Sequence, residues 1–279
     1  MDTSSIPQPE NATSTPQTSE YISNPFSATL HGLAEVLGSN PLPAILIGLV
    51  IVLSIVVLVL LELLFVVLGP VGAILAGILG LVFMIFVFPV TYGSFAYLYT
   101  ASINKQSKKT GDFIKEGIKK APSLLLGTIL TFLAIMLGLI LLVIPGLIFA
   151  AWFSLTSFVI VNENLSATAA MKRSHELVKG HIFEIWGSVF AAGILGSNGL
   201  LSFPVAASAL GIRYEQLKNL KDNNLPKPPV HWVNYILPIL GTLLIIGYIA
   251  LITLTAVSSV QKNQNVIPNY STTNSSTGL

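Results

Sequence analysis

The chain has 279 residues, of which 53% are hydrophobic and only 9% are charged, and its formal net charge is +2. Soluble domains carry about 25% charged residues, so this composition cannot cover a surface that faces water, whereas a bilayer suits it. The absence of Cys excludes disulfides, thiolate nucleophiles and thiolate metal sites.

The N-terminal part begins with a polar segment, residues 1–24, which is rich in Ser, Thr, Pro and Gln and is predicted to be a disordered tail. Asn24-Pro25 has the pattern of a helix N-cap followed by Pro at the first helical position. Either a short helix on the membrane surface or a partly ordered lead-in is expected to follow. A helical membrane domain is predicted over 25–262, and 263–279 form a second disordered polar tail.

Long uncharged windows dominate the middle of the chain, and each is longer than the about 20 apolar residues that one crossing needs. They predict an all-α fold, a polytopic helical membrane protein with about six spans, basic amphipathic surface helices and a re-entrant hairpin. The predicted spans are about 43–68, 71–101, 122–144, 147–162, 182–212 (broken or re-entrant) and 233–260.

The first two spans are separated by a predicted turn at Gly69-Pro70. Small residues then recur at four-residue spacing in two offset stripes, Gly69, Ala73, Gly77 and Gly72, Ala76, Gly80. Because small residues let helix backbones approach closely in lipid, the second span is expected to pack tightly against another helix.

Two loops between the spans carry basic amphipathic helices. In the first, Asp112 is a plausible N-cap, and in the second Asn164 or Ser166 can begin the helix and Gly180 can end it. The basic faces are predicted to contact lipid head groups through Lys115, Lys119, Lys120, Lys172, Arg173 and Lys179.

Pro145-Gly146 interrupts an apolar run that lies between these two basic loops. Short basic loops stay on the cytoplasmic side, so an even number of crossings must join them. The pair is therefore predicted to be a turn at the outer face rather than a kink inside one helix.

The window 185–212 leads to a third basic stretch, which contains Arg213, Lys218, Lys221 and Lys227, and allows two interpretations. A re-entrant hairpin with its tip at Gly196-Ser197-Asn198-Gly199 keeps that stretch on the cytoplasmic side, and we favour it slightly. One long helix kinked near Pro204 would place the stretch outside.

Few residues are candidates for chemistry. Glu62 lies inside a predicted span, and an ionisable group at that depth is a functional candidate. "HELVKGH" lacks the HExxH spacing of a zinc helix, since Lys179 stands where the second His is needed. No metal, cofactor or nucleic-acid site is predicted. A polar quartet at head-group depth could serve a lipid-modifying enzyme: His175, Glu176, His181 and Glu184.

The stretch 143–180 resembles the membrane domain of bacterial glycerophosphoryl diester phosphodiesterases and related uncharacterised multi-pass proteins. The matching positions are Pro145, Gly146, Trp152, Glu163, Ser174, Leu177 and Gly180. The resemblance implies a multi-helix membrane domain without catalytic residues of its own. The chain has no room for the catalytic barrel, so phosphodiesterase activity is not implied.

Taken together, the sequence predicts a non-enzymatic integral membrane protein that serves in scaffolding, helix packing or lipid contact. Its expected partners are membrane lipids of anionic type, a second copy of the chain, or other membrane proteins. The expected location is the cell membrane, with the N-terminus in the cytoplasm. A small transporter or channel that uses Glu62 and the broken segment near Asn198 is the alternative, and the lipid-head-group enzyme is a second one.

Overall fold

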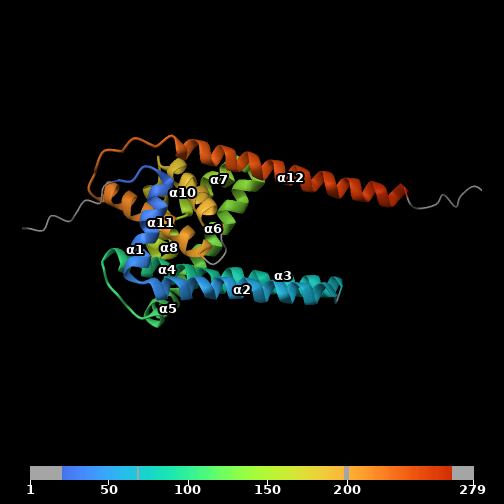
Figure 1. The fold of residues 1–279 in the computed structure, drawn as a ribbon, viewed down its shortest axis with the longest axis horizontal. Coiled ribbons are helices and arrows are strands. Elements are labelled where there is room, and N and C mark those ends of the chain that lie inside the picture. The colour runs from blue at the N-terminus through green and yellow to red at the C-terminus, as the bar shows by residue number, and fades with distance from the viewer. Residues whose placement is uncertain (1–20, 68, 198–200, 266–279) are drawn as a thin grey trace, which may run out of the picture.

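The computed structural model describes residues 21–67, 69–197 and 201–265, and within these residues the chain is helical and contains no strand (Figure 1). The all-α prediction is confirmed. The α-helices are α1 (Pro25–Ser39), α2 (Pro41–Val67), α3 (Pro70–Val82), α4 (Phe88–Ile103), α5 (Thr110–Lys119), α6 (Ala121–Leu141), α7 (Val143–Phe153), α8 (Thr156–Asn162), α9 (Ala167–Val178), α10 (Ile182–Leu195), α11 (Ser202–Asp222) and α12 (Val233–Asn265), and a π-helical turn (Phe83–Val87) joins α3 to α4.

Helix α1 begins as its sequence indicates, because the Asn24 side chain accepts hydrogen bonds from the backbone N–H groups of Phe26 and Ser27. The helix packs across α11 instead of resting alone on the membrane surface. At the crossing, a Cβ added to Gly32 would lie 2.8 Å from the carbonyl oxygen of Ser208, so only Gly permits this approach.

Helices α2 and α3 form an antiparallel arm that projects from the rest of the molecule (Figure 1). Gly69 stands before α3 with a φ of +71°, a backbone conformation that favours Gly. The π-helical turn after α3 precedes Pro89, whose ring has no N–H to continue the normal hydrogen-bond pattern. The chain then continues through α4 to the other end of the molecule.

Helices α6 and α7 form the predicted hairpin, but the reversal lies at Leu142, three residues before Pro145-Gly146. Leu142 has extended backbone angles (φ −166°, ψ 153°), and Pro145 and Gly146 belong to the start of α7. Gly146 instead gives the two arms their closest approach, since a Cβ on Gly138 would lie 2.8 Å from Gly146 Cα.

Helices α10 and α11 are separate helices joined by residues 196–201, of which 198–200 lie outside the described residues. The interpretation as one long helix kinked near Pro204 is therefore wrong. At about 1.5 Å per residue, the 14 residues of α10 are too short to cross a bilayer. Helix α11 is buried along most of its length and forms the centre of the bundle.

Helix α12 packs against α10 only near its beginning, where Asn234 meets Gly187 and Gly241 meets Phe190. From Ile239 onward, the side chains that are described are exposed or half-buried, and the helix projects as a second arm (Figure 1). Both arms carry apolar surface that only lipid or another apolar surface can cover.

Five helical segments are long and apolar enough to cross a membrane, among the described residues: Pro41–Leu63, Pro70–Ile103, Ala121–Leu141, Val143–Asn162 and Val233–Ser258. The chain is thus a multi-pass integral membrane protein. The sixth predicted segment, 182–212, corresponds to two helices, α10 of 14 residues and α11 of 21 residues. The prediction of a disordered tail over 1–24 is wrong at its end, because residues 21–24 are ordered; 1–20 and 266–279 lie outside the described residues, and 263–265 belong to α12.

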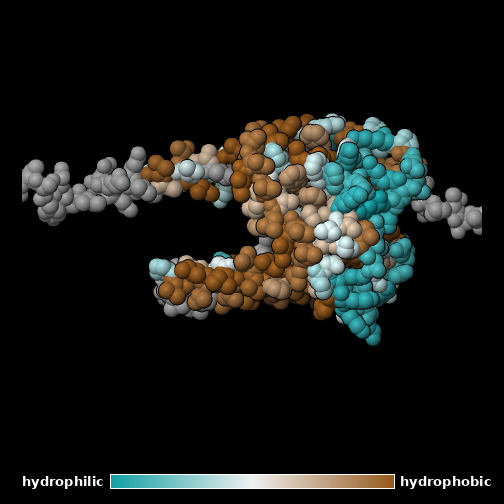
Figure 2. All heavy atoms as spheres, turned by 180° about the vertical axis from the view of Figure 1, so that it is seen from behind, coloured by the Kyte–Doolittle hydropathy of each residue, from teal (hydrophilic) through white to brown (hydrophobic). Residues whose placement is uncertain are grey.

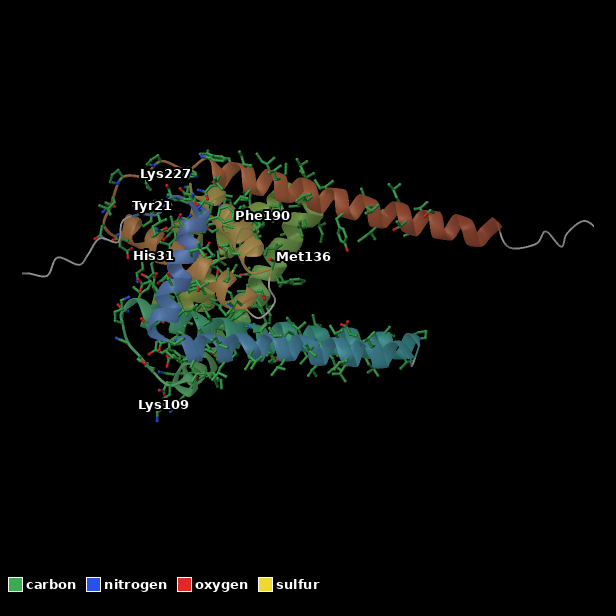
Figure 3. The ribbon with its side chains drawn as sticks, in the orientation of Figure 1. Tyr21, His31, Lys109, Met136, Phe190 and Lys227 are labelled. Atoms are coloured by element: carbon green, nitrogen blue, oxygen red, sulfur yellow. The ribbon has the colours of Figure 1, made fainter. Side chains whose placement is uncertain are left out.

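The three basic loops contain Lys105–Lys120, Lys172–Lys179 and Lys218–Lys227. They lie together at one end of the molecule, here called the polar cap. Lys120 contacts Asn164 and so joins the first loop to the second. Arg173 contacts Asp222 and Lys227 contacts the Gly180 carbonyl, which joins the second loop to the third. Hydrophilic residues gather at this end in Figure 2, and Figure 3 places Lys109 and Lys227 there. Because α10 starts and α11 ends at the polar cap, the pair doubles back.

Removing the ion pairs of Arg173 should lower stability modestly. Arg173 is bound to Glu163 at 3.2 Å and to Asp222, which connects α9 to α11. These side chains are only partly buried, so Arg173→Gln should lower the free energy of unfolding by about 1 kcal/mol. Chemical denaturation in detergent micelles measures this change. The neighbouring Lys172→Gln is the control, and equal effects of the two substitutions would contradict the prediction.

Candidate functional site

A buried polar cluster lies beneath the polar cap where α10, α11 and the first turn of α12 meet. On α10, His181, Glu184 and Ser188 share one face because they are three and four residues apart. On α11, Arg213 and Gln216 also lie three residues apart. The polar cluster consists of Tyr21, His181, Glu184, Ser188, Arg213, Gln216 and Asn234, of which all but Tyr21 are buried.

Arg213 is the centre of the polar cluster and is 0% exposed. Its Nε donates to Ser188 Oγ at 2.7 Å, and its Nη1 donates to the carbonyl oxygen of Ile22 at 2.8 Å and to Gln216 Oε1 at 2.9 Å. The ring of Tyr21 lies over the guanidinium, with 5.8 Å between the ring centroid and Cζ. The Arg213 side chain on α11 thus binds Tyr21 and Ile22, which lie just before α1.

The other charges of the polar cluster belong to α10. Glu184 is 1% exposed and is paired with His181 Nδ1. Burial lowers the pKa of Arg213, while Tyr21 and Glu184 oppose that shift, so the guanidinium stays charged. Burial also raises the pKa of Tyr21 well above its ordinary value, so its phenol stays neutral and keeps its proton.

Several polar atoms of the polar cluster have no hydrogen-bond partner among the described residues. They are Tyr21 OH, Glu184 Oε1, Arg213 Nη2, Gln216 Nε2 and Asn234 Oδ1. Buried polar atoms are normally paired, and leaving one unpaired is costly. The polar cluster therefore contains donors and acceptors that the protein's own direct hydrogen bonds do not fully satisfy.

Sequence reasoning missed this site. His181 and Glu184 were candidates for a different grouping, and Arg213 was assigned to a basic loop because it ends an uncharged window. The signal that could have found it is the run of small residues in α11, Ala206, Ala207, Ser208, Ala209 and Gly211, which favours close packing over a loop. The quartet proposed for an enzyme is also divided, since the His175 ring packs at a tilt against Trp152, with 4.3 Å between the ring centroids, and Glu176 is exposed.

The six predicted head-group residues fall into two groups. Lys115, Lys119, Lys172 and Lys179 are exposed on α5, on α9 and just after α9. The other two are engaged within the protein: the Arg173 guanidinium pairs with Glu163 and Asp222, and the Lys120 ammonium group contacts Asn164. Both side chains serve connections between helices.

Glu62 lies on the α2–α3 arm with its side chain exposed, and it forms no ion pair within the part of the chain that the structure describes. Asn198 lies outside the described residues. A cavity of about 60 Å³ between α2, α4 and α5 is apolar, and Glu62 is not among its lining residues, which are Ile47, Val50, Val90, Thr91, Ser94 and Ile114.

Of the two small-residue stripes, one faces the neighbouring helix. Gly72 and Ala76 are buried and Gly80 is half-buried, on the side of α3 that packs against α2. The other stripe points away: Ala73 and Gly77 are exposed and Gly69 is half-buried.

Within the described residues, no three His, Cys, Asp or Glu side chains come together as metal ligands would.

Comparison with known proteins corrects the family assignment. No curated protein and no solved structure matches the chain. A family model, described as Uncharacterised protein family (UPF0259), matches residues 90–195, from α4 to the end of α10. The matched family is thus not the membrane domain of the glycerophosphoryl diester phosphodiesterases, and that resemblance is wrong. Over this stretch the chain is similar to an uncharacterised family whose matched segment ends before α11.

Proposed function

We propose that the protein is a non-enzymatic membrane module that holds anionic lipid head groups on its polar cap. The observation that carries this proposal is the exposure of Lys115, Lys119, Lys172 and Lys179 at the end where apolar helices meet polar surface (Figure 2). These four lysines are not needed for contacts between loops, unlike Lys120 and Arg173.

Helix α5 is suited to this role. Its Phe113 is buried against the molecule, whereas Ile118 is 59% exposed beside the exposed Lys119. An exposed apolar residue among lysines is typical of a helix that lies at the boundary between acyl chains and head groups. Because basic loops remain in the cytoplasm, the polar cap would face the anionic cytoplasmic leaflet of the cell membrane.

Neutralising the four lysines should weaken the binding of anionic lipid. Each Lys near a charged surface contributes about 1 kcal/mol, so each Lys→Gln change should lower affinity for phosphatidylglycerol about fivefold. Native mass spectrometry of the detergent-solubilised chain, titrated with phosphatidylglycerol and with phosphatidylcholine, measures this.

The matched control replaces the same four lysines with Arg, which keeps the charge and should keep the affinity. If the quadruple Gln variant binds phosphatidylglycerol as the parent chain does, the polar cap does not hold anionic lipid.

A further inference from the structure

The ordered segment Tyr21–Asn24, here called the strap, covers the polar cluster. Arg213 Nη1 holds the Ile22 carbonyl at 2.8 Å, and Asn234 Nδ2 holds the Ser23 carbonyl at 2.8 Å. Asn24 then caps α1. Both hydrogen bonds end on main-chain carbonyl oxygen atoms of the strap. These two donors therefore bind neighbouring oxygen atoms and do not recognise a particular side chain.

Lifting the strap would complete a set of donors for an oxyanion. Arg213 Nη2 and Gln216 Nε2 already lack partners among the described residues, and removal of the strap would free Arg213 Nη1 and Asn234 Nδ2 as well. The Nη1 and Nη2 groups together form the planar fork that binds phosphate through two parallel hydrogen bonds. The strap carbonyls thus occupy positions that phosphate oxygen atoms can take.

The polar cluster presents a basic and an acidic side chain together. Arg213 is 0% exposed and Glu184 is 1% exposed. Glu184 Oε1 is an acceptor without a hydrogen-bond partner within the described part of the chain, and a primary ammonium group is a donor that suits it. The chemistry therefore fits a zwitterion with an oxyanion and a primary ammonium.

The position of Asn234 indicates where such a zwitterion comes from. Trp232 is 63% exposed and Tyr235 is 41% exposed at the start of the last span, as aromatic residues are at the head-group level of a bilayer. Tyr21 and Lys227 lie at this same end in Figure 3. We propose that the polar cluster binds the head group of an aminophospholipid of the phosphatidylethanolamine type, which displaces the strap.

The position of the strap can be measured because the chain has no native Cys. Ser23→Cys places one thiol on the strap and leaves the backbone carbonyl in place. In nanodiscs of phosphatidylcholine, the half-buried thiol should react slowly with maleimide. An equal mixture with phosphatidylethanolamine should raise the labelling rate about tenfold, because the head group displaces the strap. Phosphatidylcholine cannot replace it, since its quaternary ammonium has no N–H to donate.

Two further variants and one further lipid make the result decisive. Ser174→Cys, buried in α9, should stay protected in every lipid and so reports that the bundle is folded. Glu184→Gln, added to Ser23→Cys, should abolish the response to phosphatidylethanolamine. Equal labelling in both lipids overturns the proposal and leaves water as the partner of the free polar atoms. An equal increase in labelling with phosphatidylglycerol would also overturn this proposal. Failure of the polar-cap lysines to bind anionic lipid would contradict the proposed function but would leave this proposal standing.

Discussion

Replacing Arg213 with Met should lower the free energy of unfolding by about 3–5 kcal/mol, because its three hydrogen-bond acceptors then lose their donor in a buried place. Arg213 is fully buried, and its three hydrogen bonds connect α10, α11 and the strap. Met has a similar length and keeps the packing volume, so the loss is mainly polar. Equilibrium unfolding in mixed detergent micelles, followed by far-UV circular dichroism, measures the change.

Lys221→Met is the matched control, since it removes a positive charge from the same helix at an exposed position. It should change the free energy of unfolding by less than about 0.5 kcal/mol. Equal unfolding midpoints for Arg213→Met and Lys221→Met would show that the guanidinium does not hold the bundle together.

Two glycines of α1 should respond to Ala with opposite signs. Gly32 faces the crossing with α11, where an added Cβ would lie 2.8 Å from the Ser208 carbonyl oxygen and 3.3 Å from Ile212 Cβ. The backbone atom cannot rotate away, so Gly32→Ala should lower the free energy of unfolding by about 1–3 kcal/mol through overpacking. The same denaturation in micelles measures it.

Gly38 belongs to the same helix, but nothing lies within 4 Å of the place where its Cβ would be. Gly38→Ala should therefore raise the free energy of unfolding by up to about 1 kcal/mol, since Ala is the better helix former. A common sign for the two substitutions would mean that helix propensity, and not the crossing with α11, decides the stability of this segment.

The membrane-spanning helices could be predicted from the sequence because a helix in lipid needs only length and apolar side chains. The predicted span of about 43–68 corresponds to α2, which ends at Val67, and that of about 122–144 corresponds to α6, which ends at Leu141. Turn residues were less informative. Pro145 is compatible with the first turn of a helix as well as with a reversal, and only the extended backbone of Leu142 shows which applies.

The polar cluster could not be predicted because its members are distant in sequence. Arg213 and the Ile22 carbonyl are 191 residues apart, and Asn234 and the Ser23 carbonyl are 211 residues apart. From the charge pattern alone, an Arg that directly follows an uncharged window is predicted to be exposed to water. In the fold, α10 and the strap enclose it instead. Its partners are a hydroxyl, an amide and a main-chain carbonyl whose spacing no local pattern encodes.

These long separations have a consequence for biogenesis. The strap leaves the ribosome long before Asn234, which holds the Ser23 carbonyl and follows 211 residues later. At about 5–20 residues per second, the strap waits on the order of ten seconds or more for its partner, while the four apolar segments that precede Val233 are made. Final closure of the bundle is therefore a post-insertion event, and a nascent chain stopped before α12 should leave its own beginning undocked.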